Sequence, residues 1–267
     1  MTTRVAGIQS DRRRDAYYGR LLGTAASFFL FGLGAIVLGG LVFPVLRILP
    51  GSPAGQRARA RRLIGSAMRL FIEFMRTMGV LSYEFVGAER LGRPGELVVA
   101  NHPSLIDVVF LLAFTPGAGC VVKHGLWRNP LTRGAVSSAG YCSNLSTEGM
   151  VAAAVEALEG GQCLIMFPEG TRTRPGEPLS LHRGAANVAL KAATTVTPVF
   201  IRVSPTTLTK AEPWYRIPKR RPHFSLRVGE DLDLDSVRAV GQVPAASRVL
   251  NDRMRSVFEK ELASEGA

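Results

Sequence analysis

A histidine and an aspartate lie five residues apart in the stretch NHPSLID, residues 101–107, directly after an apolar run. On an ideal helix, side chains five positions apart point about 140° away from each other, so His102 and Asp107 would not touch if both were helical. Because proline favours the first helical position, we expect a helix that begins at Pro103, with His102 in the turn before it. Asp107 would then fix the imidazole tautomer while the other ring nitrogen takes a proton, as in general-base catalysis.

A second group of polar residues follows another apolar run. The stretch FPEGTRT, residues 167–173, comes directly after CLIM and places Glu169, Gly170 and Arg172 at the end of an expected strand. Ligand sites of α/β sheets lie at such strand ends. The guanidinium of Arg172 can hold a phosphate through two charge-assisted hydrogen bonds, and Gly170 lets the backbone approach a ligand. The alternative is an ordinary loop in which Glu169 and Arg172 form an internal ion pair.

In combination, the two stretches resemble the signature of the glycerophospholipid and lysophospholipid acyltransferase family, which includes 1-acylglycerol-3-phosphate acyltransferases. NHPSLID matches the NHx4D motif of that family, and FPEGTRT matches its second block. KHGLWRNPLTRGAVSSAGY at 123–141 resembles the intervening block, and VTPVFI at 196–201 resembles the proline-containing strand. The resemblance extends over residues 83–230 and implies a membrane O-acyltransferase of phospholipid biosynthesis.

The resemblance also implies a role for each motif position. His102 deprotonates the hydroxyl of the acceptor, Asp107 orients and stabilises His102, and the hydroxyl attacks an acyl thioester directly. The donor is acyl-CoA or the thioester of acyl carrier protein (acyl-ACP), and the acceptor is a lysolipid such as 1-acyl-glycerol-3-phosphate. No bound cofactor and no metal are implied. The residues implied in substrate binding are Glu169, Gly170, Thr171, Arg172, Lys123 and Asn144.

Several alternatives stay open. Many members that use glycerol phosphate acceptors carry arginine where this chain has Asn144, and an amide cannot replace a guanidinium against a phosphate. Either the acceptor lacks a phosphate there, as in ornithine-lipid or polyene-lipid pathways, or Arg128, Arg133 or Arg183 supplies the charge. Ser104 permits an acyl-serine scheme, although the resemblance implies no covalent intermediate. A non-catalytic lipid-binding or membrane-remodelling protein of the same fold is the remaining alternative.

Strand-like and helical patterns alternate along residues 83–267. Such alternation predicts an α/β fold with a mixed, largely parallel sheet covered by helices. The expected strands are 83–87, 96–101, 120–123, 162–167, 196–203 and 223–229, and the expected helices are 104–114, 146–161, 184–193 and 247–263.

An uncharged apolar run, residues 21–46, predicts an N-terminal membrane-inserted helical segment. As a continuous helix it would measure roughly 39 Å, more than the roughly 30 Å hydrocarbon core of a bilayer. Arginines flank the run on both sides, so the positive-inside tendency does not choose an orientation. A hairpin that bends at one of the glycines of 32–40 or at Pro44, and a single tilted span, both fit. A cleaved signal peptide is a competing interpretation, but the run exceeds the usual signal length.

Residues 56–80 have apolar residues at helical spacing with arginines between them, which is typical of a helix that lies on anionic lipid. The alternative is a helix that packs on the domain with its arginines in water. We therefore predict a basic N-terminus and membrane segment (1–50), a basic amphipathic helix at the membrane surface (51–82) and an α/β acyltransferase domain (83–267).

Charge and cysteine content narrow the partners and the compartment. The net charge is +12, and residues 1–80 hold most of it, with 12 Lys/Arg against 3 Asp/Glu. Because this charge surrounds an apolar run, it favours membrane lipid over nucleic acid as a partner. The three cysteines form no CxxC pair or metal-binding spacing, which indicates a reducing compartment. We expect a protein of the cell inner membrane with its catalytic domain on the cytoplasmic face.

Overall fold

Seven strands form one sheet within residues 16–264, the part of the chain that the computed structural model describes. Their order across the sheet is β1-β7-β6-β2-β5-β3-β4, and every neighbouring pair is parallel except β6 and β7. The predicted mixed, largely parallel sheet is thus confirmed. The strands are β1 (Ser82–Val86), β2 (Glu96–Ala100), β3 (Gly119–Val122), β4 (Cys142–Ser143), β5 (Leu164–Met166), β6 (Thr195–Ser204) and β7 (His223–Val228).

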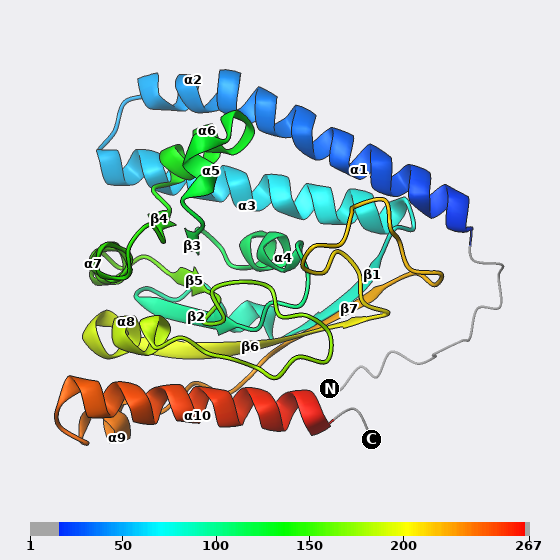
Figure 1. Ribbon diagram of the computed structural model, residues 1–267. Coiled ribbons are helices and arrows are strands. Elements are labelled where there is room, and N and C mark those ends of the chain that lie inside the picture. Colours follow the sequence, from blue (N-terminus) through cyan, green and yellow to red (C-terminus); the bar gives the residue numbers. More distant parts are fainter. Residues whose placement is uncertain (1–15, 265–267) are drawn as a thin grey trace, which may run out of the picture.

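Helices cover both faces of the sheet (Figure 1). On one face lie α3 and α4, with α1 packed outside α3, and on the other lie α8 and α10. The helices are α1 (Tyr17–Val37), the π-helical turn η1 (Leu38–Val42), α2 (Phe43–Ile48), α3 (Pro53–Thr77), the 3-10 turn η2 (Ala88–Arg90), α4 (Asp107–Phe114), α5 (Gly125–Arg128), α6 (Pro130–Ala139), α7 (Thr147–Glu159), α8 (Gly184–Ala192), α9 (Leu234–Arg238) and α10 (Val243–Ser264).

Strand β2 shows why the central strands read as continuous apolar runs. All five of its residues are buried. Val98 and Ala100 belong to the core shared with α3 and α4, whereas Leu97 and Val99 belong to the core shared with α7, α8 and α10. Successive side chains of a strand point to opposite faces, so a strand between two helical layers is apolar along its length, here from Leu97 to Ala100.

The apolar run forms one continuous helix, Tyr17–Ile48, which by length and composition could cross a membrane. Only 6% of its most apolar window is buried. The chain bends after Ile48, and not at the glycines or Pro44 that the sequence offered for a hairpin. The π turn η1 ends at Val42, two residues before Pro44, and accommodates the proline within the helix. From residue 53 the chain returns along α1 as α3 (Figure 1).

Both ends of this long helix contact the rest of the protein. At its start the Arg20 guanidinium donates hydrogen bonds to the backbone oxygens of Pro218 and Lys219, at 2.9 and 2.8 Å. Near its end η1 crosses α6 so closely that a Cβ on Gly134 would lie 2.7 Å from the Cα of Gly39. Only glycine fits at Gly134, because real Cβ atoms do not approach a backbone atom to that distance.

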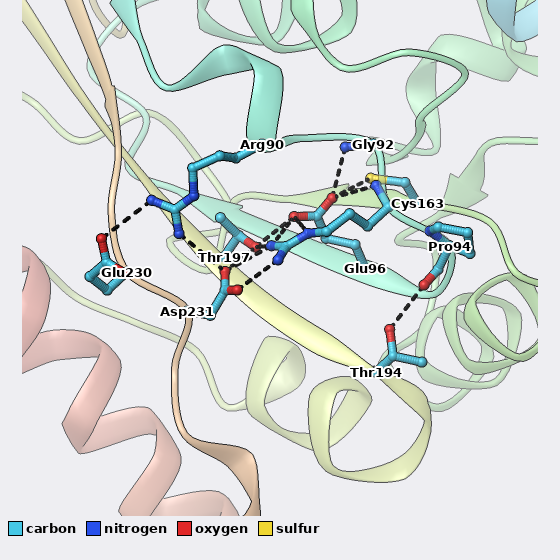
Figure 2. Close-up of polar contacts among 10 residues, drawn as sticks. Arg90, Gly92, Pro94, Glu96, Cys163, Thr194, Thr197, Glu230 and Asp231 are labelled. Atoms are coloured by element: carbon cyan, nitrogen blue, oxygen red, sulfur yellow. Dashed lines mark hydrogen bonds and ion pairs between the residues drawn. The ribbon is translucent and has the colours of Figure 1, made fainter.

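A charge network around one buried carboxylate lies near the amino-terminal ends of β2 and β6 (Figure 2). Glu96 is fully buried, and its carboxylate accepts hydrogen bonds from the Arg93 guanidinium, the Thr197 hydroxyl and the Gly92 N–H. Asp231 forms an ion pair with the same Arg93 at 2.7 Å. This network joins the turn before β2 to the segment after β7. Every charge in it has an opposite charge beside it.

Candidate active site

Four neighbouring strands end at the same edge of the sheet, and each is followed by a residue predicted to be functional. In spatial order these strands are β2, β5, β3 and β4, all mutually parallel. His102 follows β2, Glu169 follows β5, Lys123 follows β3 and Asn144 follows β4. The carboxyl ends of parallel strands are where α/β folds place ligand sites, so this topology brings the two motifs to one edge.

His102 and Asp107 form a hydrogen-bonded pair, with 3.0 Å between Nδ1 of the imidazole and Oδ2 of the carboxylate. The backbone N–H of Ser104 donates to the same Oδ2 at 2.6 Å. The imidazole stacks on the ring of Phe167, with 4.1 Å between the centroids and 23° between the planes. Asp107 is completely buried, whereas 17% of the His102 side chain is exposed. The pair therefore has a fixed buried carboxylate and a histidine that solvent can reach.

The helix begins later than the sequence predicted. It starts at Asp107, and residues 102–106, with Pro103 among them, form the turn before it. Pro103 is therefore not the first helical residue, because the Asp107 carboxylate accepts the Ser104 N–H and closes a compact turn first. The contact between His102 and Asp107 arises inside this turn and not across a helical turn.

The surroundings of Asp107 act on its pKa in opposite directions. Burial raises the pKa, whereas the hydrogen bonds from His102 and Ser104 and the nearby charge of Arg172 oppose this rise. Its Oδ1 is buried without a hydrogen-bond partner within residues 16–264. Because Oδ2 accepts a hydrogen bond, the proton of a neutral His102 lies on Nδ1, and Nε2 keeps a lone pair. Such a pair can accept a proton at Nε2 and stabilise the resulting imidazolium.

Glu169 holds the backbone of His102. Its Oε1 accepts the His102 N–H at 2.8 Å, and the Thr173 hydroxyl donates to its Oε2. The Thr173 N–H in turn donates to the His102 carbonyl oxygen at 3.1 Å. Burial raises the pKa of Glu169 to about 7. These contacts join the ends of β2 and β5, and they give the Glu169 carboxylate partners other than the Arg172 expected for an internal ion pair.

Arg172 is directed toward the loop between β6 and β7. Its Nη1 donates to the carbonyl oxygens of Leu208 at 2.8 Å and Thr209 at 3.0 Å. Gly170 has φ +66°, and a Cβ there would lie 3.1 Å from the His182 ring. The glycine is therefore needed for both its backbone conformation and its close approach to His182. Thr171, between them, is partly buried.

Lys123 and Asn144 lie farther along the same edge, and both are exposed. The Asn144 Oδ1 accepts the backbone N–H of His124 at 3.0 Å, so this amide closes the turn after β3. Within residues 16–264, neither side chain has a hydrogen bond or ion pair with His102 or Asp107. The structure thus brings His102, Asp107 and Glu169 into one hydrogen-bonded unit, and it leaves Lys123 and Asn144 on neighbouring strand ends.

Ser104 is unsuited to act as a nucleophile. It is completely buried, and its hydroxyl donates to the Thr207 carbonyl oxygen at 3.0 Å. Sequence reasoning did not single out Thr173 or Phe167, although both lie within FPEGTRT. For Thr173 a signal was present, because a hydroxyl four residues after a carboxylate can fold back onto it. No sequence signal indicated that the Phe167 ring would stack on His102.

A cavity of about 110 Å³ adjoins this unit. His102, Glu169 and Thr173 line one side of it, and Leu179 and Val203 contribute apolar side chains. A small polar edge beside an apolar lining suits a ligand with a reactive polar group and an alkyl chain.

The comparisons with known proteins agree with this geometry. Residues 82–202 match the family model Acyltransferase. The chain is 27% identical to a 1-acyl-sn-glycerol-3-phosphate acyltransferase of Pseudomonas aeruginosa, over 66% of this chain and 69% of that protein. It is 31% identical to the enzyme with the same name from Helicobacter pylori, over 43% of this chain and 53% of that protein.

A solved structure has the same fold. The 1-acyl-sn-glycerophosphate (LPA) acyltransferase of Thermotoga maritima aligns with a TM-score of 0.70 at 21% identity, and the alignment covers 91% of this chain and 96% of that one. The match of residues 82–202 to the Acyltransferase family model and the names of these relatives support an O-acyltransferase of the 1-acylglycerol-3-phosphate acyltransferase type, and the solved structure shares the fold.

Proposed function

We propose that the protein moves a fatty acyl group from acyl-ACP or acyl-CoA to the hydroxyl of a lysolipid such as 1-acyl-glycerol-3-phosphate. The observation that carries this proposal is the 3.0 Å contact between His102 Nδ1 and Asp107 Oδ2, which leaves Nε2 as the basic nitrogen. The names of the relatives from Pseudomonas aeruginosa and Helicobacter pylori support the acceptor class.

In the proposed mechanism His102 Nε2 takes the proton of the acceptor hydroxyl as the oxygen attacks the thioester carbonyl carbon. The new C–O bond forms, the C–S bond breaks, and the leaving thiolate takes the proton from the imidazolium of His102. Asp107 stabilises that imidazolium through Nδ1–H. General-base action contributes about 10²- to 10⁴-fold, so positioning and stabilisation of the oxyanion supply the rest. The mechanism uses no metal and no bound cofactor.

We assign substrate binding to the residues around this pair. Arg172 and Lys123 are the cations nearest to the site in the sequence motifs, and they would contact the head group of the acceptor or the phosphates of the donor. Glu169, with Gly170 and Thr171, would shape the same pocket and hold the His102 backbone in place. Asn144 would lie at the outer end of the pocket, beyond β3.

We also propose that the long helix holds the protein on the inner membrane, with the catalytic domain on the cytoplasmic face. Many large apolar side chains of this helix are exposed, which in water would be unfavourable over so large a patch. They include Leu22, Phe29, Leu33, Ile36, Leu41, Val45 and Ile48. In this division residues 1–50 and 51–82 attach the protein to the membrane, and residues 83–267 carry the chemistry.

The test is acyl transfer from acyl-ACP and acyl-CoA by the purified wild type and His102→Ala, with lysophosphatidate and lyso-ornithine lipid as acceptors. We expect transfer by the wild type and a fall of at least about 10²-fold in His102→Ala. If neither protein transfers to any acceptor while both bind lipid, the non-catalytic lipid-binding alternative replaces the enzyme proposal.

A second acceptor class has one observation in its favour. The Asn144 amide closes the turn after β3, and Arg172 Nη1 is occupied by two carbonyl oxygens. This leaves fewer fixed cations for a phosphate than the resemblance implies. A preference for lyso-ornithine lipid over lysophosphatidate in the same assay would favour an acceptor without a phosphate.

A further inference from the structure

The loop between β6 and β7, residues 205–222, connects the long N-terminal helix to the active-site edge. On one side the Arg20 guanidinium binds the carbonyl oxygens of Pro218 and Lys219, and Trp214 packs on Phe28 of α1 with 5.4 Å between ring centroids. This β6–β7 loop therefore lies beside the apolar helix, although about 200 residues separate them in the chain.

Two aromatic side chains of the β6–β7 loop point into solvent next to the helix. Trp214 is 41% exposed and Tyr215 is 60% exposed, and their rings contact each other at 5.8 Å. Tyr17 and Tyr18, in the first turn of α1, are exposed as well. Tryptophan and tyrosine gather at membrane interfaces because one end of the ring system is apolar and the other is polar.

The β6–β7 loop is also strongly basic. It has five cations against one carboxylate, that of Glu212. All five cations are exposed, and none forms an ion pair with a carboxylate of residues 16–264. They are Lys210, Arg216, Lys219, Arg220 and Arg221. Unpaired cations next to exposed aromatic rings suit an anionic lipid surface, because cations attract the head groups while the rings enter the interface.

The other side of the β6–β7 loop contacts the active-site residues. Its Thr207 carbonyl oxygen accepts the Ser104 hydroxyl, and its Leu208 carbonyl oxygen accepts both the Leu105 N–H at 3.1 Å and Arg172 Nη1. A lipid surface that touches the outer part of this loop would therefore lie close to the turn that holds His102.

We propose that the β6–β7 loop is a second membrane-contact surface, separate from the apolar face of the long helix, and that it docks on anionic phospholipid. Trp214 and Tyr215 lie at the level of the head groups, and Lys219, Arg220 and Arg221 contact the anionic phosphates. This proposal rests on the proposed membrane association of the long helix. It adds that the bilayer also touches a loop bonded to the active-site edge.

The fluorescence of Trp214 tests the position of the loop. The chain has two tryptophans, so Trp127→Phe leaves Trp214 as the sole one. We expect its emission to shift to the blue on vesicles of phosphatidylcholine and phosphatidylglycerol, and lipids brominated near the head-group end of the chain to quench it most. Unchanged emission from protein that sediments with the vesicles would overturn the loop proposal alone. A full-length protein that sediments with no vesicles would contradict membrane association and this proposal together.

A charge variant tests the partner. We expect the triple variant Lys219→Gln, Arg220→Gln, Arg221→Gln to lose at least about tenfold in its preference for anionic over zwitterionic vesicles. The matched control is Lys191→Gln, Arg248→Gln, Lys260→Gln, which removes three exposed charges from α8 and α10 on the opposite face. The control should bind like the wild type.

Two results of this experiment would overturn the proposal. One is a loop variant that binds anionic vesicles as the wild type does. The other is a loop variant with unchanged vesicle binding and a raised KM for acyl-ACP but not for acyl-CoA, because the basic loop would then serve an acidic carrier protein.

Discussion

Buried carboxylates occur at both ends of the central strands, and they are compensated differently. At the amino-terminal end the buried Glu96 and the exposed Asp231 share the Arg93 guanidinium (Figure 2), which holds the pKa of Asp231 below its usual range. At the carboxyl end Asp107 and Glu169 have no guanidinium or ammonium partner within residues 16–264, and burial raises the pKa of both. A buried carboxylate beside a permanent cation stays ionised and is costly to deprive of that cation, whereas one without such a cation can respond to a proton that arrives nearby.

The largest effect on this comparison is expected from Asp107→Asn. The amide has no negative charge, so the imidazolium of His102 loses the charge that stabilises it. We expect kcat to fall about 10³-fold with little change in the thermal midpoint. Steady-state kinetics with circular dichroism melting will check this. A variant with kcat within threefold of the wild type would contradict the assigned role of Asp107.

Arg93→Ala should disrupt the charge network at the amino-terminal end of the strands. It leaves Glu96 buried without its cation, which we expect to lower the free energy of unfolding by about 2–4 kcal/mol, with kcat of the folded protein unchanged. Denaturant titration measures the loss. The control is Arg90→Ala, whose ion-pair partners Glu230 and Asp231 have side chains 95% and 33% exposed and whose loss should cost less than about 1 kcal/mol. Equal losses in the two variants would show that the burial of Glu96 is unimportant.

Glu169→Gln should change how stability depends on pH. The pKa of Glu169 is about 7 in the fold and near 4.5 when unfolded, so the folded state binds more protons between these values. The free energy of unfolding should therefore fall as pH rises from 4.5 to 7, by up to about 3 kcal/mol from this group. Glutamine does not titrate, so the difference between the two stability curves isolates this contribution. A difference that does not vary with pH would exclude the raised pKa.

Thr173→Val should have the smallest effect. It removes the hydroxyl that binds Glu169 Oε2 but keeps the shape of the side chain. We expect a loss of about 1 kcal/mol in stability and a modest fall in kcat at unchanged KM, because the side chain of Thr173 positions His102 only through Glu169. Thr173→Ser keeps the hydroxyl and should restore kcat. If serine fails to restore it, the hydroxyl alone does not account for the role of Thr173.

The sequence predicted local features better than long-range ones. Strands β2 and β5 were predictable because residues buried on both faces read as apolar runs, and the motifs at their ends indicated the functional edge. The start of α4 was not predictable, because the side chain of Asp107 closes the preceding turn. The contact of Glu169 with the His102 N–H could not be predicted either, since it joins residues 67 positions apart.

The hydrogen-bond partners of Arg172 could not be predicted from the sequence either. Arg172 was expected at a phosphate, yet its Nη1 binds carbonyl oxygens 36 and 37 residues later in the chain. Nothing in the sequence near Arg172 marks those acceptors, because every residue has a backbone carbonyl. The chemistry of a side chain can be inferred from a motif. Whether backbone carbonyl oxygens occupy that side chain can be known only from the fold.

The crossing of η1 and α6 at Gly39 and Gly134 fixes the position of the long helix relative to the active-site edge. With two backbones in direct contact, the long helix cannot slide along the domain without moving α6, which follows the turn after β3 and the short helix α5. The distance from the layer where the helix lies to the active-site edge is then a constant of the molecule. Under the proposed membrane association, acceptors would be distinguished partly by the distance between their hydroxyl and the hydrocarbon of the bilayer, without any single side chain being specific for that length.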